Sequence, residues 1–119
     1  GSLVPVVVSA QISVGSGVTW DSDVIDVRGY RYITIAHRTT ANTAKTITLL
    51  LFRDSAATQT YGELTDITNT ESPYVIVPKS SGSVGGVARV PIAFPYVKLR
   101  FSHAVQDTRV HQYTYRLEM

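Results

Sequence analysis

Two segments of the chain alternate apolar and polar residues with a period of two. They cover residues 23–37 and 95–101. Because successive side chains of a β-strand point to opposite faces of a sheet, this alternation predicts half-buried strands. No segment shows a comparable helical period. The pattern therefore predicts an all-β protein.

A third segment, residues 46–53, carries apolar side chains on both of its faces. Ile47, Leu49 and Leu51 share one face, and Leu50 and Phe52 share the other. A strand that is apolar on both sides is covered on both sides. We therefore expect this segment to be a central strand.

Turn residues separate the remaining extended stretches. With about eight short strands and turn signals recurring about every 8 to 12 residues, the sequence predicts an antiparallel two-sheet β-sandwich of jelly-roll type. We expect residues 3–119 to form this single domain and interpret Gly1 and Ser2 as the remnant of an expression tag. We also expect the last two strands to form a hairpin, with Asp107 in its turn.

The composition narrows the class of protein. The chain has 119 residues, 44% of them hydrophobic and 17% charged, so it can bury a real core. It contains no cysteine, which excludes disulfides and thiolate zinc sites. The apolar run over residues 3–8 is far shorter than the roughly 20 residues of a membrane span, so we expect no membrane insertion. The net charge of +2 comes from scattered basic residues, whereas nucleic-acid binders carry a basic stripe; we expect no nucleic-acid partner.

Catalytic motifs are missing from the sequence. There is no nucleophile elbow, the carboxylates are few, and no glycine-rich loop leads into a helix. We therefore expect a protein that is not an enzyme and that needs no cofactor.

Three histidines suggest a metal site as one alternative. His37, His103 and His111 fall at predicted strand ends, and the last two flank the expected hairpin as possible cross-strand neighbours. The alternative interpretation is that the three are surface histidines at loop ends. The sequence has no fixed ligand spacing, so it favours the second.

Three aspartates near a bend suggest a calcium site in the same way. Asp21, Asp23 and Asp26 could supply oxygen ligands, but the segment lacks the glycine and the distal glutamate of a calcium loop. Short polar side chains also satisfy backbone groups in bends and bulges. The second role is favoured, and no metal is expected.

Exposed aromatic residues are candidates for contacts with a partner or a glycan. The chain has seven tyrosines and one tryptophan, and aromatic rings stack on sugars. Trp20, Tyr32 and Tyr96 are the candidates. The alternative is that tyrosine is a good strand former that tolerates a wet hydroxyl at a rim or interface.

Basic residues on the last two strands give a second set of candidate contacts. Lys98 and Arg100 alternate outward on one strand, and Arg116 and Gln112 on the expected hairpin partner. Together they would form one positive sheet face that suits an acidic partner, although an ordinary solvated face explains them equally well.

Three parts of the chain resemble small β-sandwich domains of tailed-phage virion proteins. They are residues 22–35, the strand ending in Arg53-Asp-Ser55, and residues 95–101 before a last strand. Virion domains of this kind include head-decoration proteins and jelly-roll modules of tails. The resemblance implies a non-enzymatic structural protein of the virion that binds a capsid or tail protein and forms a homo-oligomer, with a trimer favoured. The scaffold is also similar to galactose-binding-type and other carbohydrate-binding modules, which would imply a glycan ligand. An interaction domain from a larger surface protein is a third alternative.

The apolar N-terminal segment is a candidate assembly arm. As an extended strand it could be added to the sheet of a neighbouring molecule. The residues of this arm are Leu3, Val4, Pro5, Val6, Val7 and Val8.

Overall fold

The computed structural model describes residues 4–39, 45–78, 85–103 and 107–119. Within these residues the chain forms ten strands and no helix, and thus no helix able to cross a membrane. The strands are β1 (Val6–Val14), β2 (Trp20–Asp21), β3 (Ile25–Asp26), β4 (Tyr32–Thr39), β5 (Lys45–Phe52), β6 (Thr60–Leu64), β7 (Val75–Val77), β8 (Gly85–Pro91), β9 (Tyr96–His103) and β10 (Arg109–Glu118).

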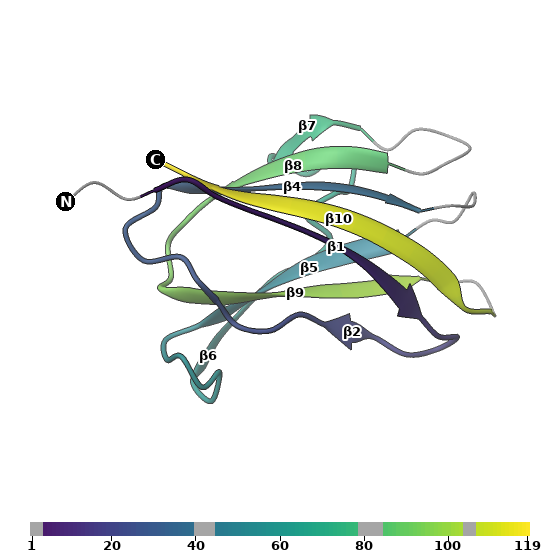
Figure 1. The fold of residues 1–119 in the computed structure, drawn as a ribbon, viewed down its shortest axis with the longest axis horizontal. Helices are drawn as coiled ribbons and strands as arrows, with labels where there is room; N and C mark the ends of the chain where they lie inside the picture. The colour runs from purple at the N-terminus through teal and green to yellow at the C-terminus, as the bar shows by residue number, and fades with distance from the viewer. Residues whose placement is uncertain (1–3, 40–44, 79–84, 104–106) are drawn as a thin grey trace.

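The strands form two antiparallel sheets that pack face to face (Figure 1). Sheet 1 has the order β1-β10-β4-β8-β7, and sheet 2 has the order β2-β9-β5-β6, with β3 also paired to β9. Since β2 and β3 pair with successive parts of β9, they are one interrupted edge strand. With the short β7 set aside, eight strand positions then follow the jelly-roll order. The predicted fold class is confirmed.

The core lies between the two sheets and comes from the alternating positions of the sequence. Its fully buried members include Ile33 and Ile35 of β4, Leu49 of β5, and Leu99 and Phe101 of β9. On β10, Tyr113 and Leu117 face the same core. The period-two pattern therefore identified the inward faces correctly.

Strand β5 is covered on both faces, as predicted. It lies between β9 and β6, and every residue except Thr46 is buried. The outer-face residues Leu50 and Phe52 lie opposite Lys98 and Tyr96 of β9. The Lys98 ammonium sits 5.9 Å from the centre of the Phe52 ring, so the long side chains of the neighbouring strand shield this outer apolar surface.

The predicted hairpin between the last two strands is wrong. β9 belongs to sheet 2, where it pairs with β5, whereas β10 belongs to sheet 1, where it pairs with β1 and β4. Asp107 therefore lies in a connection that crosses from one sheet to the other. Alternation specifies which side of a strand is buried but not which strand is its neighbour, and closeness in sequence was a misleading guide here.

The segment between Asp54 and Ser72 is anchored to strand β5 at two points. Strand β6 occupies part of it, with Leu64 opposite Leu49. Ile67, which is completely buried, anchors the turn that follows, and its N–H donates to the carbonyl of Ile47 at 2.9 Å.

Candidate functional site

The candidate contact residues do not form one site. Trp20 points into the sandwich, where its ring centre lies 5.9 Å from Phe101 and 5.8 Å from Tyr113. Tyr32 belongs to sheet 1 and Tyr96 to sheet 2. The three aromatic side chains expected to stack on a glycan are therefore separated by the body of the protein.

The predicted positive face is divided in the same way. Lys98 and Arg100 lie on the outer face of sheet 2, whereas Arg116 and Gln112 lie on the outer face of sheet 1. This correction follows directly from the missing hairpin. No single surface combines the four side chains.

Tyr32 and Tyr96, the two outward candidate tyrosines, each contact an arginine of the same chain. The guanidinium of Arg89 is 5.6 Å from the centre of the Tyr32 ring, and that of Arg28 is 5.2 Å from the Tyr96 ring. These distances fit cation–π contacts. One face of each ring is therefore already covered by a guanidinium group, which weakens the case for sugar stacking at either tyrosine.

The aspartates near β2 and β3 bind arginines. Asp21 accepts two hydrogen bonds from Arg100, at 2.7 and 2.9 Å, and Asp26 forms an ion pair with Arg28 at 2.8 Å. Their pKa values are lowered chiefly by these hydrogen bonds. Among the described residues, no group of three or more possible metal ligands occurs. The calcium alternative therefore has no geometric support here.

The bend between β2 and β3 is built around a serine. The N–H of Ser22 donates to the carbonyl of Leu99 at 2.8 Å, and the Ser22 hydroxyl accepts from the N–H of Leu99 at 2.9 Å. The Ser22 hydroxyl thus replaces a backbone carbonyl as the acceptor for the N–H of Leu99. This is the backbone-satisfying role that the sequence predicted for the polar stretch.

Two of the three candidate histidines are brought together. His103 Nδ1 lies 3.1 Å from His111 Nε2, and His103 Nε2 lies 2.9 Å from the carbonyl oxygen of Asp107. They come from opposite sheets, so the expected cross-strand pairing is wrong although the closeness is right. His37 of β4 stands in register with Tyr113 and Gly86. In the part of the chain that the structure describes, it does not form a three-ligand metal group with His103 and His111.

The environment of His111 favours a neutral ring. His111 is completely buried, and its pKa falls to about 4 because of desolvation first and then the nearby Lys45 and His103. Lys45 is itself 1% exposed. A buried ammonium beside the pair disfavours a bound cation, so this cluster supports the architecture rather than metal chemistry.

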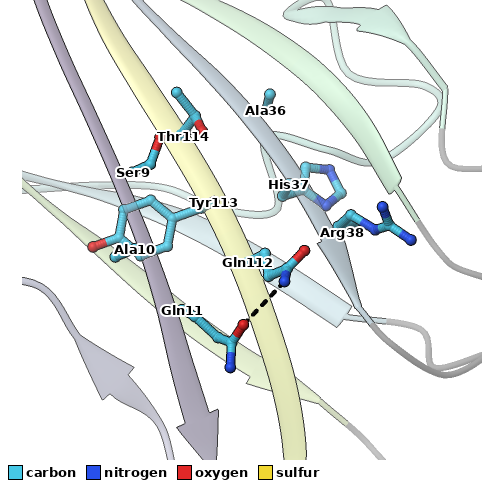
Figure 2. Close-up of a pocket in the computed structure, with 9 residues that line it drawn as sticks. All are labelled: Ser9, Ala10, Gln11, Ala36, His37, Arg38, Gln112, Tyr113 and Thr114. Atoms are coloured by element: carbon cyan, nitrogen blue, oxygen red, sulfur yellow. Dashed lines mark hydrogen bonds between the residues drawn. The ribbon is translucent and has the colours of Figure 1, made fainter.

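The outer face of sheet 1 contains a shallow hollow of about 500 Å³ (Figure 2). Its outward side chains come from three neighbouring strands: Ser9 and Gln11 from β1, Gln112 and Thr114 from β10, and Ala36 and Arg38 from β4. The amide of Gln112 donates to Gln11 at 3.0 Å, and the hydroxyls of Ser9 and Thr114 are 2.7 Å apart.

This hollow was not predicted. Its residues are separated by up to about a hundred positions and become neighbours only through the pairing of β1 with β10 and of β10 with β4. The available signal was the polar half of each alternating strand. Without the strand order, those polar positions could not be assembled into one surface.

Beside the hollow, β1 forms the edge of sheet 1. It pairs with β10 on one side and is the last strand in the sheet order. Pro5 directly precedes β1, and proline in a sheet is confined to edge strands, strand starts and bulges. None of the nine residues of β1 is charged. A long, uncharged edge is unusual, because proteins normally protect such edges with charges, bulges or covering segments.

The predicted arm is largely part of this edge strand. Val6, Val7 and Val8 pair with Leu117, Arg116 and Tyr115 of the same chain. Val4 and Pro5 lie just before the strand and are exposed, and Leu3 lies outside the described residues. Donation of the whole segment to another molecule would therefore require breaking an existing sheet, whereas its open edge is available without rearrangement.

Comparisons with known proteins give no family. No protein-family model matches the chain, and no curated protein matches it. One similar structure is a pilus protein of Bacillus endospore appendages, described as disulfide-linked pili, with 10% identity and a TM-score of 0.36 over 100% of this chain and 92% of that chain. Another is the K1 cleaved adhesin domain of Lys-gingipain from Porphyromonas gingivalis W83, with 9% identity and a TM-score of 0.43 over 85% of this chain and 63% of that chain. Likenesses at this level establish neither a family nor a function.

Proposed function

We propose that this chain is a non-enzymatic assembly domain that acts through protein–protein contacts and self-association. The observation that carries the proposal is the open edge of β1, which presents nine residues without a charge at the end of sheet 1. Unpaired N–H and C=O groups along such an edge bind another strand readily. The rigid sandwich behind the edge holds these groups in place, so little conformational entropy is lost on association.

A role in a phage virion is the finer form of this proposal. It has the support of the resemblance in residues 22–35, 53–55 and 95–101 to head-decoration and tail domains. In this form the chain attaches to a capsid or tail protein. Co-sedimentation of the purified chain with virions that lack it tests this role: binding that saturates supports attachment, and the absence of binding at any concentration counts against it.

Sedimentation velocity over a wide range of concentrations tests the self-association. We expect the mass to rise from 13.0 kDa to a defined multiple as the concentration increases. The mass of a closed oligomer reaches a plateau, because assembly leaves no free edge to bind further chains. A mass of one chain throughout the range would overturn self-association.

Carbohydrate binding is a second candidate function, and the hollow on sheet 1 favours it. Gln11, Gln112 and Arg38 supply amide and guanidinium groups around a surface of suitable size. Glycan-array binding that is lost in an Arg38→Ala variant but kept in a Lys98→Ala variant would support it. Lys98 is the matched control because it lies on the opposite sheet.

A further inference from the structure

We infer that the partner of the β1 edge is the β1 edge of a second copy. This inference rests on the proposed self-association and makes it specific. The two strands run antiparallel about a two-fold axis at Ala10, the middle residue of β1. Sheet 1 then continues from one molecule into the next and becomes a ten-stranded sheet.

The three other described sheet edges fit β1 poorly. At one side of sheet 2, β2 and β3 form an interrupted edge of two residues each that carries Asp21 and Asp26. At the far side of sheet 1, β7 has only three residues, an irregular register and a proline directly after it. At the far side of sheet 2, β6 has five residues, a register shift and the charged Glu63. Head-to-tail pairing of β1 with any of these edges would leave much of the nine-residue strand unpaired. Pairing β1 with the β1 of a second copy joins two strands of equal length.

The sequence of β1 is complementary to itself in this arrangement. Centring the two strands on Ala10 places Val8 opposite Ile12 of the second copy and Val6 opposite Val14. All of these side chains face the core side of sheet 1. On the outer side, Ser9 stands opposite Gln11. Inward residues therefore meet inward residues, polar residues meet polar residues, and no like charges are opposed.

The pairing would also cover apolar surface that the single chain leaves exposed. Val6, Val8, Ala10 and Ile12 are only half-buried, although three of them, Val6, Ala10 and Ile12, pack against the core cluster. A second strand beside them shields these side chains along the edge. A nine-residue antiparallel pair also forms about eight to ten backbone hydrogen bonds. The contact is isologous and closes after two copies, so it predicts a dimer rather than the trimer that the phage resemblance favours.

Charged substitutions on β1 test both the edge and its register. In the variant Ser9→Lys with Gln11→Lys, four lysines would meet across the two-fold axis. In the variant Ser9→Lys with Gln11→Glu, each lysine would stand opposite a glutamate. A matched control, Gln112→Lys with Thr114→Lys, removes the same side-chain hydrogen bonds from the β10 side without charging the edge.

The molar mass of each variant is measured by light scattering, with circular dichroism confirming that it is folded. We expect the wild type, the Lys/Glu variant and the control to dimerise, and the Lys/Lys variant to weaken dimerisation at least about tenfold. If the Lys/Lys variant dimerises like the wild type, or if the Lys/Glu variant or the control loses the dimer as well, the β1 pairing is wrong. In those cases self-association itself stands. If the wild type never associates, both the pairing and the proposed self-association fail.

Discussion

His103 Nδ1 and His111 Nε2 lie 3.1 Å apart and connect the two sheets at one end of the sandwich. His103 comes from the end of β9 and His111 from the start of β10. Within the described residues, Nδ1 of His111 is buried without a hydrogen-bond partner. A protonated ring at this position would be a buried charge beside Lys45, which explains why the neutral form is favoured.

This arrangement predicts that acid destabilises the fold. The pKa of His111 is about 4 in the folded chain against an ordinary value of 6.5, so between these values the unfolded chain binds the extra proton. The contribution of His111 to the free energy of unfolding is therefore highest above pH 6.5 and falls as the pH drops toward 4. The loss reaches about 3 kcal/mol, since each pKa unit corresponds to about 1.4 kcal/mol. Urea unfolding at several pH values measures it.

A His111→Gln variant should flatten that dependence, because it removes the titrating group. A His103→Gln variant is the control, since burial is the largest cause of the lowered pKa and Lys45 is the next. We expect the control to keep most of the pH dependence. An equally steep dependence in His111→Gln would assign the acid sensitivity to another group.

The serine between β2 and β3 predicts a second effect on stability. In Ser22→Ala, the buried N–H of Leu99 loses its acceptor, which lies 2.9 Å away. An unsatisfied buried donor costs about 1 to 3 kcal/mol, so we expect a loss of this size in chemical denaturation. Ser13→Ala is the control, because Ser13 is exposed on β1 and should change the stability by less than about 0.5 kcal/mol. Equal losses in the two variants would contradict the account.

Trp20 distinguishes a packing role from a glycan-binding role. Its contacts with Phe101 and Tyr113 predict that Trp20→Ala lowers the free energy of unfolding by about 2 to 4 kcal/mol, somewhat less than for a fully buried ring. The exposed Val18→Ala serves as the control, with little change expected. A Trp20→Ala variant of wild-type stability that has lost glycan binding would reverse this interpretation.

The inward faces and the fold class were predictable from the sequence because strand alternation is a local property. The alternation of residues 30–38 placed Ile33 and Ile35 in the core, and the doubly apolar segment became the covered strand β5. These predictions needed no knowledge of which strands are neighbours.

The pairing of strands was not predictable in the same way. The assignment of Lys98 and Arg116 to one face failed because β9 and β10 lie in opposite sheets. The hollow of Figure 2 and the open edge of β1 depend on the same long-range order. Such order is decided by the packing of the whole sandwich, so short sequence patterns do not reveal it.

Disulfide cross-linking at Ala10 tests the central claim most directly, because these 119 residues include no cysteine. In the two-fold arrangement, Ala10 faces its own copy at about 4.5 to 5.5 Å between Cα atoms, which is within the range for a disulfide. Ser13 lies on the same strand, but its two copies would be roughly 20 Å apart. After mild oxidation, we predict that Ala10→Cys gives a covalent dimer of twice 13.0 kDa and that Ser13→Cys does not. Equal yields from the two variants, or no dimer from Ala10→Cys, would contradict the account.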